Sequence, residues 1–245
     1  MSVYEISRDV MQASLRESRM VVERLCQSIG VPDGVLRSVT DCGVYSAALG
    51  LSGFPGLERQ LDLLQRNAAG PMTVKEQGKS LLFDGAGQHA WFAADPALDI
   101  LVAAYRVDGE AEMIVRNVVE PAELGVIVAL AEKHGLNGEV TGREDGNLLV
   151  RVSDRNADEP TVLDRIIQEG VPVAASLWFH LFHRSHDALA ADTVISRTHT
   201  GSVIVKPDGT IIGKEDPEFV DTDLSMLTVE TLVEPQFMQS RRGAS

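Results

Sequence analysis

The sequence predicts an α/β protein in which an N-terminal helical region packs on a mixed-sheet α/β domain. Three observations lead to this fold class. Apolar residues recur at helical intervals in the first part of the chain, short apolar runs then alternate with helical segments, and the last part combines helices with a hairpin pattern. We therefore expect a helical region over residues 1–72, a mixed-sheet domain over 73–153, and a final part, 154–245, that completes the domain.

The N-terminal region is predicted to be all helical. Ser2 and Glu5 have the spacing of a capping box, so the first helix is expected to begin there and to end at Gly30. A second helix is expected from Asp33 to Leu49. The stretch GLSGFPG from Gly50 interrupts the pattern, because glycine and proline destabilise helices by about 1 and 3 kcal/mol. It predicts a corner before a third helix, whose buried residues are Leu57, Leu61, Leu64 and Ala68.

The middle of the chain alternates strand and helix patterns. SLLFD from Ser80, AEMIVRNV from Ala111 and DGNLLVRV from Asp145 are typical of strands. DPALDILVAAYR begins with Asp95 as N-cap and a proline at the first helical position, and a second proline-initiated helix begins near Glu120. The order strand, helix, strand, helix, strand, strand predicts a layered domain with a mixed sheet.

The last third is predicted to hold two helices and a hairpin. The helices are expected over 160–170 and 173–191. GSVIVKPDGTIIG from Gly201 is typical of a hairpin whose turn is Pro207–Asp208–Gly209.

Composition excludes several classes of partner. Acidic residues outnumber basic ones 36 to 22, for a net charge of -14, and this field repels the phosphates of nucleic acid. Apolar runs such as VIVALA from Val126 are far shorter than the roughly 20 residues of a membrane span. The N-terminus has no hydrophobic signal segment, so we expect a cytoplasmic protein. Cys26 and Cys42 are too few for a disulfide framework and are expected to be reduced thiols.

From Leu25 to about Val140 the chain resembles the malate/L-lactate dehydrogenase-type NAD(P)-dependent oxidoreductases. The matching segments are LCQSIGVP, AALG before the glycine-rich break, LERQLDLLQRNAAG, LLFDGAGQ, IVRNV and a helix near PAELG. The resemblance implies a non-Rossmann fold, reduction of 2-oxo and cyclic imino acids with NAD(P), and a homodimer with shared sites. In such a dimer, Phe54 is expected to be an exposed anchor of the GLSGFPG corner.

Two histidines of that family are missing from the matching positions. The family's Ser-His-Gly corresponds here to Gly53–Gly56, and the histidine after its RN strand corresponds to Val118–Pro121. Histidine suits proton transfer near neutral pH by its unperturbed pKa. We therefore expect a dehydrogenase-like protein without hydride transfer that binds a small carboxylate or serves as a partner subunit. The alternative is an active small-molecule enzyme, NAD(P)-dependent or metal-dependent, that uses C-terminal histidines.

Candidate site residues fall in three segments. Arg116 and Asn117, at the end of a strand, are expected to bind substrate, although Glu120 and Glu123 at the next helix start disfavour an anion there. In SRTHTGS, Arg197 matches a carboxylate's two oxygens and His199 is a candidate catalytic group, while a hydrogen-bonded turn is the alternative. In FDGAGQHAW, glycines admit a ligand beside His89, a second candidate catalytic group; a tight β-turn explains the pattern equally well.

A histidine cluster near the end of the helical part allows two interpretations. His180, His183 and Asp187 would share one helix face, within reach of a single metal ion, with His186 nearby. The spacing matches no metal-binding signature such as His-Glu-x-x-His, so a solvated face or a subunit contact is preferred and no metal is predicted.

Overall fold

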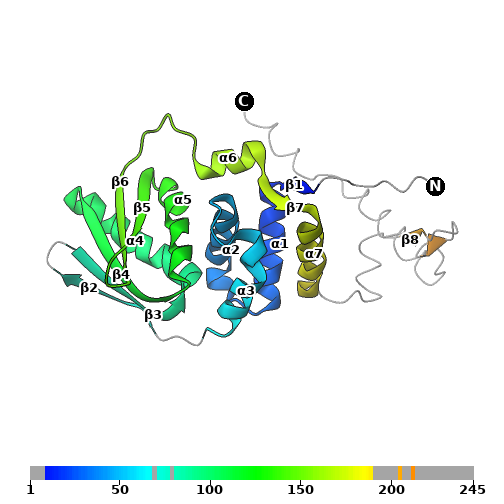
Figure 1. Cartoon of the computed structure of the whole chain (residues 1–245), viewed down its shortest axis with the longest axis horizontal. Helices are drawn as coiled ribbons and strands as arrows, with labels where there is room; N and C mark the ends of the chain where they lie inside the picture. Colours follow the sequence, from blue (N-terminus) through cyan, green and yellow to red (C-terminus); the bar gives the residue numbers. More distant parts are fainter. Residues whose placement is uncertain (1–8, 68–70, 78–79, 190–203, 206–210, 213–245) are drawn as a thin grey trace, which may run out of the picture. The chain divides into compact units, whose positions relative to one another are not determined.

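The computed structural model describes residues 9–67, 71–77, 80–189, 204–205 and 211–212 of the chain (Figure 1). The chain forms two compact units, Met1–Leu189 and Ala190–Ser245. The helical part and the sheet both belong to the first unit, and the expected three-part division of the chain stays a prediction. Among the described residues, no helix is long and apolar enough to cross a membrane.

The first helix begins later than the sequence predicts. Val10–Ala13 is a strand, β1, which pairs with β7 (Val171–Ala174) in a two-stranded antiparallel sheet. Helix α1 (Leu15–Ser28) starts after Ser14, whose side chain and that of Glu17 form a capping box. The prediction of a helix through Val10 is therefore wrong: the true cap is Ser14, while Ser2 and Glu5 lie outside the described residues.

Two more helices complete the helical part. Helix α2 (Asp33–Ala48) confirms the second predicted helix, and α3 (Gly53–Gln65) begins inside the glycine-rich stretch. The amide of Gly53 donates to Ser46 Oγ at 3.0 Å, which holds the corner. The predicted exposure of Phe54 is wrong: its side chain is 2% exposed and its ring meets Trp178 edge-on at 5.4 Å. Phe54 is apolar and lies on the face of α3 that faces the core, as Leu57, Leu61 and Leu64 do.

The main sheet has five strands in the order β2-β3-β4-β6-β5. They are β2 (Thr73–Gln77), β3 (Ser80–His89), β4 (Ala111–Val119), β5 (Leu136–Gly142) and β6 (Leu148–Asp154). Only β3 and β4 are parallel, and helix α4 (Ala90–Asp108) connects them. The mixed-sheet α/β class is confirmed.

Helix α4 starts at a different cap from the predicted one. His89, not Asp95, is the N-cap, and Pro96 lies inside the helix. Pro96 is the seventh residue of α4, so the signal at Asp95 and Pro96 lies inside the helix, where the proline removes one backbone hydrogen bond. The segment after β4 forms the 3-10 helix η1 (Pro121–Val126) and then α5 (Ile127–Glu132), so the predicted proline-initiated helix is present with a tighter first turn.

The remaining elements of the first unit return to the helical part. Helix α6 (Val162–Glu169) leads into β7, and α7 (Ala175–Ser185) and η2 (His186–Ala188) follow. The predicted helix over 173–191 thus begins with two strand residues, because Val171 and Val173 pair with β1 and point into the core. In the second unit, β8 (Ile204–Val205) and β9 (Ile211–Ile212) form the predicted hairpin, and its turn lies outside the described residues.

Candidate functional site

The candidate site lies where β3 and β4 run side by side toward their carboxyl ends. These two strands are parallel, and Asp84 lies opposite Arg116. The register shifts between Asp84 and Gln88, so β3 bulges there instead of making the tight turn that the sequence also allowed. Ligand sites in α/β proteins commonly form at the carboxyl ends of parallel strands. The bulge therefore places FDGAG at the end of the sheet where such ligand sites form.

Gly85 is required by the close approach of the two strands. A Cβ at this position would lie 2.5 Å from Val118 Cγ2 and 3.0 Å from the carbonyl oxygen of Asn117. Gly87 has a φ of +75°, which side chains rarely adopt. Packing and backbone conformation thus account for both glycines.

Asp84 holds the two predicted substrate-binding residues. Its Oδ2 accepts from Arg116 Nε at 3.0 Å, and its Oδ1 accepts from Asn117 Nδ2 at 3.1 Å. Oδ1 also accepts from the amide of Ala86 at 2.9 Å. These hydrogen bonds, that of Ala86 first, lower the pKa of Asp84. The structure brings Arg116 and Asn117 together, and it pairs both with a carboxylate of the chain itself.

Three residues other than glycine adopt a left-handed backbone at this edge. They are Ala86 (φ 54°), Asn117 (φ 52°) and Glu120 (φ 55°), and they are the three such residues in the described chain. Asparagine tolerates this conformation, whereas in alanine and glutamate it is sterically unfavourable. Backbone strain of this kind clusters at functional sites when the surrounding contacts hold it in place.

Glu120 is held by helix α3. Its two carboxylate oxygens accept from Arg59 Nη1 and Nη2, each at 2.7 Å, and Oε2 also accepts from Gln60 Nε2 at 3.4 Å. The hydrogen bond with Arg59 is the largest cause that lowers the pKa of Glu120. Glu120 thus bonds to α3, which sequence reasoning missed because it treated the residue as a helix-dipole partner.

His89, the N-cap of α4, is fully buried. Its Nδ1 accepts from the amide of Trp91 at 3.1 Å, so Nε2 carries the proton and donates to Gln60 Oε1 at 2.7 Å. Gln60 Nε2 in turn donates to Ser52 Oγ at 3.0 Å. Burial lowers the pKa of His89 to about 4.

Glu123 ties the same region to the helical part. It is buried; Oε1 accepts from the amide of Ser52 at 2.9 Å and Oε2 accepts from Trp91 Nε1 at 2.9 Å. The glycine-rich corner is therefore joined to η1 and α4 by two hydrogen bonds on one carboxylate. Glu123 has a structural role here, because each of its carboxylate oxygens already accepts a hydrogen bond from the chain.

A cavity of about 460 Å³ lies beside His89. It opens between the α1–α2 loop, the end of α3 and the start of α4, and its polar lining includes Asn67 and Gln88. Asn67 Oδ1 accepts from the backbone amide of His89 at 3.1 Å. The volume falls in the range of small-molecule sites, about 300–1,000 Å³. Apolar walls come from Val31, Pro32, Val35, Leu64 and Phe92.

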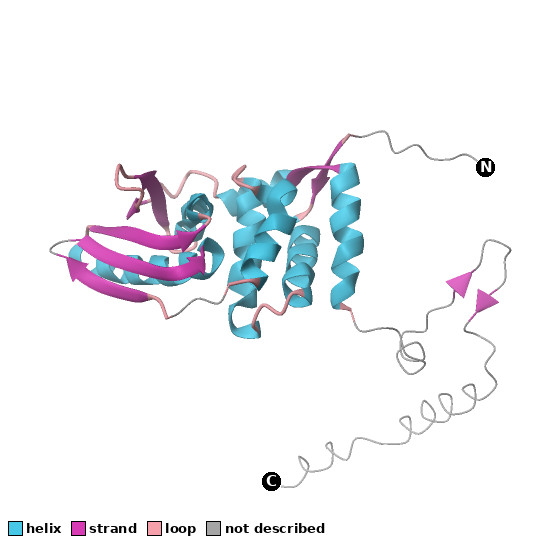
Figure 2. Cartoon of the chain, turned by 60° about the horizontal axis from the view of Figure 1, so that its bottom comes forward, coloured by secondary structure: helices cyan, strands magenta, loops and turns pink. Residues whose placement is uncertain are grey.

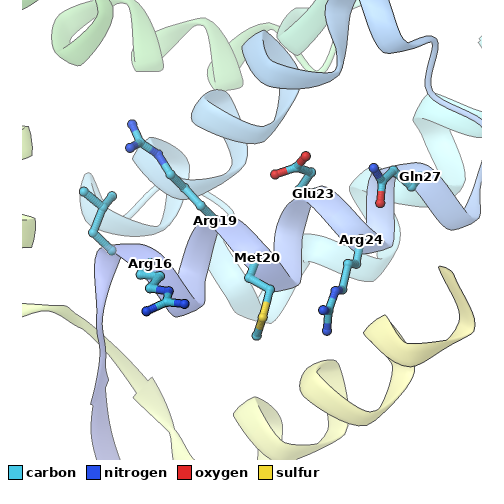
Figure 3. Close-up of a pocket in the computed structure, with 7 residues that line it drawn as sticks. Arg16, Arg19, Met20, Glu23, Arg24 and Gln27 are labelled. Atoms are coloured by element: carbon cyan, nitrogen blue, oxygen red, sulfur yellow. The ribbon is translucent and has the colours of Figure 1, made fainter. Parts of the chain in front are cut away.

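A second groove, of about 570 Å³, runs along α1 (Figure 3). Arg16, Met20 and Arg24 project from one side of the helix, and Arg19 and Glu23 project from the other. Arg19 is paired with Asp41 at 3.0 Å. No candidate residue from the sequence lines this groove, so it is separate from the site described above.

The C-terminal histidines do not join this site. His180 Nε2 lies 2.9 Å from Glu58 Oε1, which also accepts from Arg184, and His183 and His186 lie beside the Phe182 ring. Within the described ranges, no group of three or more His, Cys, Asp or Glu side chains is arranged to hold a metal ion. Arg197 and His199 lie outside the described residues.

The two cysteines are buried free thiols. Burial raises the pKa of Cys26 to about 12 and raises that of Cys42 well above its ordinary value. Since the thiolate is the nucleophile, neither residue is suited to nucleophilic catalysis.

Comparison with solved structures shows a dehydrogenase-like fold. A dehydrogenase from Sinorhizobium meliloti matches with a TM-score of 0.51 at 13% identity, covering 72% of this chain and 99% of that one. At this identity the likeness concerns the fold alone, and at that level it confirms the resemblance seen in the sequence.

Two malate dehydrogenases are also similar. The protein from Pyrococcus horikoshii OT3 gives a TM-score of 0.44 at 15% identity, with 80% of this chain and 70% of that one covered. The protein from Entamoeba histolytica gives 0.44 at 13% identity, with 62% and 47% covered, so the match spans about half of its length. No family model matches the chain, and no curated protein matches it in sequence.

Proposed function

We propose that this protein is a dehydrogenase-fold binder of a small carboxylate that does not itself transfer hydride. The observation that carries the proposal is the state of His89. Of the site residues described above, it alone has an imidazole, and it is buried with a pKa lowered to about 4. A general acid for carbonyl reduction needs a pKa near the working pH and access to the substrate. His89 meets neither condition and acts as a positioning residue for Gln60.

Arg116 and Asn117 are the proposed carboxylate-binding pair. The Arg116 side chain is 47% exposed, and its guanidinium already binds a carboxylate, that of Asp84, at the distance of a direct ion pair. A ligand carboxylate would exchange with Asp84, a step favoured by the solvent exposure of the pair. Asn117, with its left-handed backbone, donates its side-chain amide to the other oxygen of the same carboxylate.

A nicotinamide dinucleotide fits the described site poorly. Its pyrophosphate needs free backbone amides at a helix N-terminus or unpaired cations. Here η1 begins after Glu120, Glu123 lies in its first turn, and both carboxylate oxygens of Glu120 already bind Arg59. We therefore assign no step to NAD(P), and its binding stays an expectation of the family resemblance.

The proposal is tested by calorimetric titration with pyruvate, oxaloacetate and malate, comparing wild type with Arg116→Ala. The matched control is Arg151→Ala, because Arg151 is similarly exposed (52%) and also pairs with a carboxylate, Glu112, on the same sheet. We expect loss of at least tenfold in affinity for Arg116→Ala and no change for the control. Equal binding by all three proteins, or binding by none, would refute the carboxylate site.

The absence of hydride transfer is tested separately. Wild type is incubated with NADH or NADPH and each 2-oxo acid, and oxidation of the cofactor is followed by absorbance. We expect no turnover. Turnover that His199→Ala abolishes while the fold is kept would instead establish the alternative, an active enzyme that uses a C-terminal histidine.

A further inference from the structure

The cavity of about 460 Å³ beside His89 is not part of the proposed carboxylate site, because neither Arg116 nor Asn117 lines it. Figure 2 shows the helical part beside the main sheet, and the cavity lies at the boundary between them. The ends of α1 and α3 and the start of α2 line it from one side, and β3 and α4 line it from the other. The cavity is therefore separate from the Arg116 site.

Four helices begin or end at this cavity. Helices α2 and α4 begin there, and their first turns contribute Val35 and Phe92 to the lining. Helices α1 and α3 end there, and the lining includes Ile29 and Leu64 from these ends. A helix start carries partial positive charge and unpaired amides, whereas a helix end carries partial negative charge and unpaired carbonyls. Two starts and two ends offset each other, so the cavity has hydrogen-bond donors and acceptors without a net charge.

The side chains that line the cavity are uncharged. Although 24% of the sequence is charged, no charged residue lines the cavity within the described part of the chain. Its polar side chains are three carboxamides, those of Gln65, Asn67 and Gln88. A charged ligand would lose its hydration there without gaining an ionic partner, and burying an unpaired charge costs far more than burying an amide. The lining therefore favours an uncharged ligand.

Asn67 contributes a hydrogen-bond donor that is held in place. Its Oδ1 accepts from the backbone amide of His89 at 3.1 Å, so the carbonyl end of this carboxamide is fixed and Nδ2 is the other end. Nδ2 forms no hydrogen bond with another residue that the structure describes. Since Asn67 lines the cavity, its NH2 group is available to an acceptor on a ligand.

We propose that this cavity binds an uncharged ligand that has an apolar body and one amide group. The carbonyl oxygen of the ligand accepts from Asn67 Nδ2, and its NH group donates to a carbonyl oxygen at the helix ends. The apolar body packs against Val31, Leu64 and Phe92. This ligand differs in kind from that of the Arg116 site, which requires a negative charge.

Saturation-transfer difference NMR of the full chain with benzamide tests the proposal. Benzoate and benzamidine have the shape of benzamide with one negative and one positive charge, and each is added as a competitor of bound benzamide. Displacement reports the cavity alone, because benzoate bound at Arg116 does not displace benzamide. We expect a dissociation constant of about 1 mM for benzamide, and displacement at least about tenfold weaker by either charged analogue than by unlabelled benzamide. Failure of benzamide to bind, or equal displacement by a charged analogue, would overturn the proposal.

Asn67→Asp replaces the donor with a negative charge of the same shape. The variant keeps an oxygen that accepts from the amide of His89. We expect benzamide to bind at least about tenfold more weakly and benzamidine to bind in its place, because an amidinium and a carboxylate form two parallel hydrogen bonds. The control is Asn137→Asp on β5, which adds the same charge at an exposed position outside the cavity. Unchanged affinity of Asn67→Asp for benzamide would overturn the proposal.

Val35→Lys tests the same site without altering the bond to His89. It adds a positive charge to the lining, and Val74→Lys on β2 is the matched control, since the two valines are 39% and 41% exposed. We expect benzoate to displace benzamide at least about tenfold more effectively from Val35→Lys than from wild type, with no change in the control. If both lysine variants keep the selectivity of wild type, benzamide binds elsewhere and the proposal is wrong. This comparison also decides the question if circular dichroism shows that Asn67→Asp is unfolded.

Discussion

Replacing His89 with asparagine isolates the effect of the buried imidazole on stability. Asparagine is a good N-cap, so the variant keeps an acceptor for the amide of Trp91 and loses the titrating ring together with its bond to Gln60. The pKa of His89 is lowered from 6.5 to about 4 in the folded protein by burial. Between these two values the unfolded chain binds a proton that the folded chain does not, so stability falls as the pH falls from about 7 toward 4.

The size of the effect follows from the two pKa values. From pH 7 to pH 5, the free energy of unfolding of wild type should drop by about 2 kcal/mol more than that of His89→Asn. This window lies above the ordinary pKa values of carboxylates, so the groups with lowered pKa, such as Asp84 and Glu120, contribute little to the difference.

Urea unfolding at pH 7, 6 and 5 provides the measurement, since urea is uncharged and leaves electrostatics unscreened. The loss of the bond to Gln60 lowers the stability of the variant at every pH and does not alter the slope. Equal slopes for wild type and His89→Asn would refute the reasoning. They would mean that the imidazole has the same pKa in the folded and the unfolded chain, and the argument that the site lacks a proton donor would fail with it.

Two further substitutions test the packing around the site. Gly85→Ala should destabilise the protein by about 1–3 kcal/mol, because its Cβ would collide with Val118; Val118→Ala should recover part of that loss, and Gly34→Ala, with open space around it, should not destabilise, all by urea unfolding. If Gly85→Ala leaves the free energy of unfolding unchanged, the bulge can accommodate a Cβ at this position. Phe54→Ala should cost about 3–5 kcal/mol through the lost contact with Trp178 and leave sedimentation unchanged, whereas a change in association with little loss of stability would restore Phe54 as a surface anchor.

The elements predicted best are those whose signals are local. The second helix and the strands from Ser80 and Ala111 match α2, β3 and β4, since apolar periodicity reports the face that each element buries. The starts of α1 and α4 were misplaced. In each case a valid capping signal, at Ser2 and at Asp95, competed with another, at Ser14 and at His89.

Part of the candidate site was also visible in the sequence. Arg116, Asn117 and His89 were singled out from a strand end and a glycine-rich run, and the structure places all three at neighbouring ends of β3 and β4. Their partners were not found. Asp84 lies 32 residues from Arg116, and Gln60 lies 29 residues from His89, so no spacing rule links them.

The sequence by itself determined the class of the fold and the glycine-rich corner. These follow from composition and from local order along the chain. Only the tertiary structure decided the charge state and the availability of the remaining groups. Burial holds His89 neutral, and Asp84 and Glu120 bind the two arginines of the site. The physical reason is that a pKa and an ion pair depend on neighbours in space, and folding brings those neighbours from distant parts of the chain.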